Sequence, residues 1–227
     1  MNFLIKAEEI LGRNLKPEEG ITISLIKEKE KQLEIKIPQV LIEFYATIGN
    51  NLLFIDGFQH FAKIDDLFVT DGKLVFLQEN QSVVYWAVDL EDSQTIFQTT
   101  DQNFNAKAEW FKEKFSLRDF LEHLLYFQCI MADESYHRKA NSGFTHFASL
   151  EIDEYHKNVI SQKFISSLDQ HSKIITKHNG LVIFWKPDAI TMYFTNNKGE
   201  ICDLIMTCVK SESLLDILID TYGFNEL

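Results

Sequence analysis

The chain has 227 residues and a formal net charge of −12, and 45% of its residues are hydrophobic. This hydrophobic fraction, with nineteen Phe residues, excludes an intrinsically disordered chain and suffices for one large domain or two small ones. The negative charge disfavours binding to nucleic-acid phosphates and to anionic membranes, because both need Lys and Arg. It suits a basic protein partner, although such acidity is also typical of soluble proteins without one.

The three cysteines, Cys129, Cys202 and Cys208, form no CxxC pair. Their odd number argues against a disulfide framework and is typical of reduced cysteines in a cytoplasmic protein. No segment has the pattern of a signal peptide, and no apolar run reaches the roughly 18 residues of a transmembrane helix. The sequence therefore predicts a cytoplasmic protein that does not enter a membrane.

The first fifty residues predict three helices. Asn2–Leu11 has apolar residues at helical spacing, and Ile21–Ile35 is a second candidate. The charged middle of the second, Lys27–Glu34, is interpreted as solvated surface. Ile37–Asn50 is the third helix, with Pro38 expected at its first position, where a missing N–H costs nothing.

After residue 52 the pattern changes to short apolar runs, which are typical of strands. The runs predicted as strands are Leu74–Leu77, Val83–Val88 and Thr95–Phe97. The polar turn Gln78–Ser82 predicts that the first two runs form a hairpin. Tyr85 and Trp86 face opposite sides of the second strand, so we expect one in the core and the other free to anchor a partner. Trp110 is expected to cover the edge of the core.

A further helix is predicted to start at Ser116, which is a good N-cap with Asp119 in the capping-box position, and to end near Met131. The polar residues 132–150, with the turn Asn141-Ser142-Gly143, predict an internal boundary. We therefore expect an α+β domain at 1–143 and an extension at 144–227 that packs with it as one body.

Within the extension, the sequence pattern predicts a helix at Tyr155–Leu168 and a last helix capped by Ser211. Between these two helices, three apolar runs separated by turns predict an antiparallel meander. The three predicted strands are Leu181–Trp185, Ile190–Thr195 and Ile201–Val209. The meander could extend the first sheet or form a second one. The predicted class is α+β, with a mainly antiparallel sheet flanked by helices and a C-terminal three-stranded meander and helix.

Motifs of known catalytic chemistry are missing from the sequence: there is no P-loop, GxGxxG, HExxH or GxSxG pattern. The adjacent acid pairs, such as Asp65-Asp66 and Asp133-Glu134, are interpreted as solvated loop residues. His171 and His178 flank a strand without a metal-ligand spacing, and His123, beside Glu122, is expected to be exposed. We therefore predict no catalytic residue, no cofactor and no metal site.

Acidic residues concentrate between Asp56 and Asp101, where nine acids face only two lysines. This stretch, with one aromatic residue, is the predicted partner-binding region: Asp56, Asp65, Asp66, Asp71, Glu79, Tyr85, Asp89, Glu91, Asp92 and Asp101.

Three segments together resemble the SUKH superfamily of bacterial immunity proteins and fungal cell-wall-synthesis regulators. Ile37–Asn50 is similar to its signature helix, Leu74–Asp89 to its hairpin with Glu-Asn-Gln and a Trp strand, and Ser116–Met131 to its closing helix. The resemblance covers residues 20–131. Here Gly49-Asn50 reverses the Asn-Gly that usually ends the signature helix.

The resemblance implies a non-enzymatic immunity protein that neutralises a cognate toxin, often a nuclease or a deaminase. A basic toxin would suit the acidic region, because opposite potentials speed association. A regulatory scaffold that binds a cellular protein is the alternative that the fungal relatives suggest. A third possibility is an enzyme of unrecognised type, which would need acidic and histidine side chains to converge in a deep pocket.

Overall fold

The computed structural model describes residues 2–104, 108–152, 160–178 and 180–227. The chain divides into two compact units, of which the first comprises Met1–Glu8 and Asn14–Ala140, and the second Glu9–Arg13 and Asn141–Leu227. The break after Ala140 lies inside the polar stretch 132–150. That the two parts pack as one body stays a prediction.

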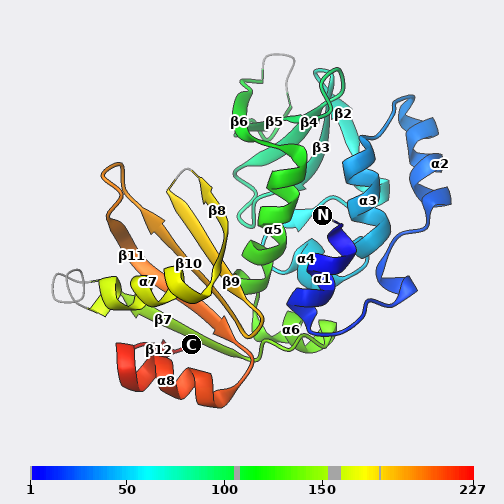
Figure 1. Ribbon diagram of the computed structural model, residues 1–227. Helices are drawn as coiled ribbons and strands as arrows, with labels where there is room; N and C mark the ends of the chain where they lie inside the picture. Colours follow the sequence, from blue (N-terminus) through cyan, green and yellow to red (C-terminus); the bar gives the residue numbers. More distant parts are fainter. Residues whose placement is uncertain (1, 105–107, 153–159, 179) are drawn as a thin grey trace. The chain divides into compact units, whose positions relative to one another are not determined.

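The first unit is built from helices, then strands, then helices (Figure 1). Its helices are α1 (Phe3–Leu11, whose last turn belongs to the second unit), α2 (Ile23–Leu33), α3 (Gln39–Ile48), α4 (Leu52–Asp56), α5 (Leu117–Met131) and α6 (Glu134–Ala140). The predicted helices α1, α2, α3 and α5 are confirmed, whereas α4 and α6 were not predicted. The expected position of Pro38 was wrong by one residue, because its ψ of 135° places it before α3 as the N-cap.

The sheet of the first unit has six antiparallel strands: β1 (His60–Phe61), β2 (Phe68–Thr70), β3 (Lys73–Gln78), β4 (Tyr85–Asp89), β5 (Thr95–Thr99) and β6 (Phe111–Ser116). Their order is β1-β3-β4-β5-β6, and β2 also pairs with β3. The predicted hairpin is confirmed, with Lys73 opposite Asp89 and Gln78 opposite Tyr85.

Helices α3 and α5 cover one face of this sheet (Figure 1). The ring centroids of Phe76 on β3 and Phe120 on α5 are 6.2 Å apart, and Trp86 on β4 lies 6.0 Å from the same Phe120 ring. Because side chains alternate along a strand, Tyr85 and Asp89 point to the opposite face. We call that opposite side the outer face. The burial expected for this pair was wrong, since both Tyr85 and Trp86 are half-buried.

One interpretation of charged residues is wrong in part, and another is wrong entirely. Most of the Lys27–Glu34 stretch is exposed as expected, but two of its charged residues are buried. In the Lys27–Glu34 stretch, Lys29 is 8% and Glu30 4% exposed, because Lys29 Nζ donates to the Asp65 carbonyl (2.6 Å) and Glu30 accepts from the Ile37 N–H (2.9 Å). His123 is buried rather than exposed. Its ring stacks between two phenylalanines, 5.6 Å from Phe115 and 5.7 Å from Phe127.

The second unit has its own six-stranded antiparallel sheet, in the order β12-β7-β11-β10-β9-β8. Its elements are β7 (His146–Glu151), α7 (Ile160–His171), β8 (Lys173–His178), β9 (Leu181–Lys186), β10 (Ala189–Thr195), β11 (Ile201–Val209), α8 (Glu212–Tyr222) and β12 (Asn225–Glu226). The predicted meander is β9-β10-β11 and belongs to this separate sheet. Of the predicted helix 155–168, residues 155–159 lie outside the described part.

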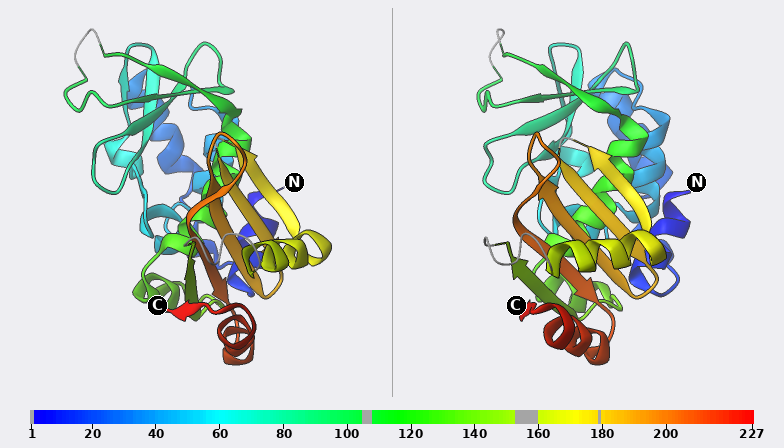
Figure 2. Two further views of the ribbon diagram at one scale, coloured as in Figure 1. Left: turned by 90° about the vertical axis from the view of Figure 1, so that its left-hand side faces the viewer. Right: turned by 60° about the vertical axis from the view of Figure 1, so that its left-hand side comes forward.

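Helices α7 and α8 lie on one face of the second sheet (Figure 2). Their apolar residues, such as Phe164 on α7 and Leu218 on α8, pack with Val182, Phe184 and Val209 from the strands. The hydrophobic core of the second unit therefore fills the space between two helices and an antiparallel sheet. The α+β class predicted from the sequence is confirmed.

Candidate protein-binding surface

Four of the predicted acidic residues meet at one end of the first sheet. Asp71 lies in the turn between β2 and β3, and Asp89 is the last residue of β4, directly opposite Lys73. The N–H of Leu90 donates to the Gly72 carbonyl (3.0 Å), so the chain after β4 lies against the β2–β3 turn. We call Asp71, Asp89, Glu91 and Asp92 the acidic rim.

Hydrogen bonds within the turn hold two of these carboxylates in place. Asp89 Oδ1 accepts from the N–H groups of Glu91 (2.8 Å) and Asp92 (3.0 Å). Asp92 Oδ2 accepts from the Thr95 hydroxyl (2.6 Å), and this hydrogen bond is the main cause that lowers the pKa of Asp92. The Glu91 carboxylate is exposed, and it is the backbone N–H of Glu91 that takes part in the turn. The rim is thus an ordered, charged turn.

Trp110 joins the rim to the outer face of the sheet. Its Nε1 donates to Asp71 Oδ2 (3.1 Å), and its ring stacks on Phe104 with centroids 6.5 Å apart. Lys73 Nζ lies 4.9 Å from the centroid of Phe97 and 5.5 Å from that of Trp110. The amine of this lysine is therefore held over two aromatic rings, at the edge of the acidic rim.

The predicted anchor Tyr85 packs into the same aromatic group. Phe104 contacts Tyr85 and Phe68 edge-on, each with centroids 4.9 Å apart. We call Phe68, Tyr85, Phe104 and Trp110 the aromatic row. Aromatic side chains are enriched at the centres of protein interfaces, and charged side chains are more common in the surrounding rim. Phe68 and Phe104 were missed by sequence reasoning, and Trp110 was expected only to cover the core edge.

Other predicted acids lie elsewhere. Glu79 is in the β3–β4 loop, where its Oε2 accepts from the N–H groups of Gln81 (2.9 Å) and Val83 (3.3 Å). Asp101 follows β5 and accepts from the Asn103 N–H (2.9 Å). Since Gln78 and Thr99 both pair with Tyr85, Glu79 and Asp101 lie just beyond the strand ends that are opposite to the rim. Asp101 nevertheless begins the β5–β6 loop, which also carries Phe104 and Trp110. Asp65 and Asp66 are exposed in a 3-10 turn, Ile64–Asp66.

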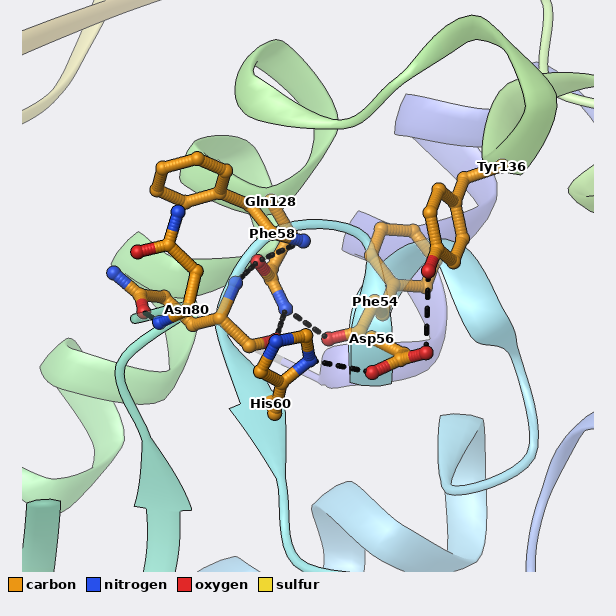
Figure 3. A network of polar contacts seen from close by, with 8 residues as sticks. Phe54, Asp56, Phe58, His60, Asn80, Gln128 and Tyr136 are labelled. Carbon is orange, nitrogen blue, oxygen red and sulfur yellow. Dashed lines mark hydrogen bonds and ion pairs between the residues drawn. The ribbon is translucent and has the colours of Figure 1, made fainter. Parts of the chain in front are cut away.

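Asp56, the remaining predicted acid, binds two side chains at the end of α4 (Figure 3). Its Oδ1 lies 2.6 Å from His60 Nδ1, and its Oδ2 accepts from the Tyr136 hydroxyl (3.2 Å). Burial is the main cause that raises the pKa of Tyr136, and the neighbouring Asp56 charge raises it further. His60 and Asp56 keep 41% and 44% of their side chains exposed, so this cluster is a polar surface patch.

The segment between α4 and His60 is fixed by the buried amide of Gln128 (Figure 3). Gln128 Oε1 accepts from the N–H groups of Phe58 (3.1 Å) and Gln59 (2.7 Å). Its Nε2 donates to the carbonyls of Phe54 (3.1 Å) and Gln59 (2.6 Å). All four hydrogen bonds go to the backbone, so Gln128 acts as a structural clamp. Gln128 lies within the helix predicted from Ser116 to about Met131, and its sequence context gave no sign of this role.

Among the described residues, no three or more His, Cys, Asp or Glu side chains come together in a group that could hold a metal ion. The side chains of His171 and His178 lie outside the described ones. None of the described helices is both long and apolar enough to cross a bilayer. Cys129 and Cys208 are buried, Cys202 is half-buried, and these three described cysteines form no disulfide bond.

Comparisons of the chain with models of protein families, with curated proteins and with solved structures give no match.

Proposed function

We propose that the protein is a non-enzymatic binding protein, and specifically a cytoplasmic immunity protein that neutralises a cognate toxin. The proposal rests on the residues that resemble the SUKH superfamily and on one structural observation. That observation is the acidic rim, in which backbone N–H groups hold the Asp89 carboxylate and the Asp71 carboxylate accepts from Trp110 of the aromatic row. We infer that this rim and row together form the toxin-binding surface.

The chemistry of this surface suits a basic partner. Carboxylates fixed by backbone N–H groups need little reordering when Lys or Arg binds them, which lowers the entropic cost of association. The formal charge of −12 supports fast encounter with a positively charged protein. If the toxin is a nuclease, the acidic rim would occupy the groove that otherwise binds phosphates. Trp110 and Tyr85 would supply the apolar contact area that slows dissociation.

Co-expression with the product of the neighbouring gene tests the proposal. We expect that product to arrest growth when expressed alone, to be harmless in the presence of this chain, and to co-purify with it as a stable complex. A neighbouring product that is not toxic and does not bind would contradict the immunity function. A housekeeping protein that binds without any toxicity would instead support the scaffold alternative.

A further inference from the structure

The second unit encloses a cavity of about 240 Å³ between its sheet and the helices α7 and α8. Helix α7 crosses one face of this sheet (Figure 2), and the residues that line the cavity come from α7, α8 and the strands β9, β10 and β11. Most of the wall is apolar, and includes Phe164 and Leu168 from α7, Leu214, Leu218 and Tyr222 from α8, and Val209 from β11. Small-molecule sites typically combine such a wall with a few polar groups.

A pair of threonine hydroxyls supplies those polar groups. Thr191 on β10 and Thr207 on β11 lie opposite each other and are only 2% and 3% exposed. Their Oγ1 atoms are 2.9 Å apart, so one hydroxyl donates to the other. The hydrogen of the second hydroxyl is then available to an acceptor atom, and both oxygens keep lone pairs. A buried donor of this kind favours a ligand that carries a hydrogen-bond acceptor.

The cavity opens to solvent beside residues that are only partly buried. Ile217 on α8 is 52% exposed, and the Lys186 side chain at the end of β9 is 32% exposed. Lys186 Nζ lies 3.5 Å from Asp188 Oδ1, so its positive charge is balanced at the opening. A paired charge at the mouth and hydroxyls inside favour an uncharged ligand over an ion, because burying an unpaired charge is costly.

We propose that this cavity binds a small uncharged molecule with an apolar body and one carbonyl or hydroxyl oxygen, which accepts a hydrogen bond from the Thr191–Thr207 pair. An apolar cavity of about 150 Å³ already admits benzene, so about 240 Å³ has room for a ring with a short substituent. This site lies in the second unit and is separate from the proposed toxin-binding surface, so either proposal can fail without the other.

Titration of the full chain with acetophenone and with ethylbenzene, followed by methyl NMR, tests the site. The two probes share an aromatic ring and differ in the carbonyl oxygen. We expect acetophenone to shift the methyl signals of Leu168, Leu214 and Leu218. In the double variant Thr191→Val, Thr207→Val, which keeps the side-chain shape, acetophenone should bind roughly threefold to tenfold more weakly, while ethylbenzene binds as before.

Two further variants locate the binding. Leu214→Trp places a large ring in the cavity and should abolish binding of both probes. Thr176→Val removes a buried hydroxyl on β8, outside the cavity, and should change neither. Circular dichroism confirms that each variant is folded. Failure of acetophenone to shift these methyl signals at millimolar concentration, equal weakening of both probes in the double variant, or unchanged binding in Leu214→Trp would each overturn the proposal.

Discussion

The indole Nε1 of Trp110 donates a hydrogen bond to Oδ2 of Asp71 over 3.1 Å, although the two residues are 39 positions apart in the sequence. Asp71 belongs to the acidic rim and Trp110 to the aromatic row, so this bond connects the charged and the apolar parts of the proposed surface. A hydrogen bond to a carboxylate is stronger than one between neutral groups, and it restricts the rotation of the indole ring. A restricted aromatic side chain loses less entropy when a partner binds it.

Loss of this bond can be detected in the indole N–H signals of Trp110 and Trp86. In Asp71→Ala, we expect the Trp110 signal to shift because its acceptor is gone, while the Trp86 signal stays in place. Glu113→Ala is the matched control, because Trp86 Nε1 donates to Glu113 Oε1 over the same 3.1 Å. It should move only the Trp86 signal. Unchanged indole spectra in Asp71→Ala would refute the contact.

Replacement of Gln128 should destabilise the first unit strongly. Gln128→Leu keeps a similar volume but leaves two backbone N–H groups and two carbonyls without their buried partner. Unmet buried polar groups cost about 1–3 kcal/mol each, partly relieved when water enters, so we expect a loss of about 3 kcal/mol. Urea denaturation measures it, with the exposed Gln94→Leu as control. A loss equal to that of the control would show that the clamp contributes nothing.

His137 should make the protein sensitive to mild acid. Burial lowers its pKa to about 4, although the hydrogen bond between Nε2 and the Cys129 carbonyl (2.8 Å) opposes this shift. Between about pH 6.5 and pH 4 the unfolded chain takes up a proton that the folded chain does not, so folding stability falls as the pH falls. The expected loss is about 3 kcal/mol.

The variant His137→Gln should remove most of this pH dependence, because Gln does not titrate. Urea denaturation of both proteins at pH 7 and at pH 4.5 provides the comparison. We expect the free energy of unfolding of the variant to change less between the two pH values than that of the unsubstituted chain. Parallel pH profiles would contradict the assignment.

Glu30 should stabilise the fold only while it is ionised. Burial by itself raises the pKa of this carboxyl, but hydrogen bonds from Lys27 and from the Ile37 N–H outweigh burial and lower the pKa. Its contribution is therefore present above the unfolded pKa of 4.5 and is lost as the pH falls through the folded value. We expect Glu30→Gln to lower the free energy of unfolding by about 1 kcal/mol at pH 7. The exposed Glu28→Gln on the same helix should lower it little. An equal cost in both variants would be inconsistent with this role.

The elements that sequence reasoning predicted correctly depend on neighbouring residues. Ser116 caps α5 by accepting from the Asp119 N–H (3.2 Å), and the β3–β4 hairpin follows from two apolar runs around a polar turn. His123 was misread because its adjacent Glu122 suggested solvent, whereas the buried side of α5 places the His123 ring between Phe115 and Phe127. Local patterns therefore predicted the elements better than the burial of charged residues.

In the candidate site too, features set by neighbouring residues could be predicted, whereas contacts between distant residues could not. Asp89 and Asp92 could be predicted as turn residues, and their acidity was evident from the sequence. The pairing of Asp71 with Trp110 depends on the outer face of the folded sheet, and that of Asp56 with Tyr136 joins residues 80 positions apart. A single sequence contains no signal for such contacts.

The structure also sharpens the choice of residues for a binding test. Reversal of Asp89, Glu91 and Asp92 together would disturb the turn, since Asp89 and Asp92 hold it through their carboxylates. Glu91→Lys changes the charge of the rim while leaving those hydrogen bonds in place. Trp110→Ala removes the aromatic contact. Exposed Glu28→Lys on α2 makes the same charge change as Glu91→Lys outside the proposed surface and serves as the control.

The affinity of these variants for the proposed toxin, once a neighbouring gene product that this chain neutralises has been found, tests the central proposal most directly. We predict that Glu91→Lys slows association by roughly tenfold at low salt and less at high salt, because the effect is electrostatic. Trp110→Ala should weaken binding by roughly thirtyfold through faster dissociation, and Glu28→Lys should bind like the unsubstituted chain. If Glu91→Lys and Trp110→Ala bind the toxin as tightly as Glu28→Lys does, the acidic rim and the aromatic row are not the toxin-binding surface.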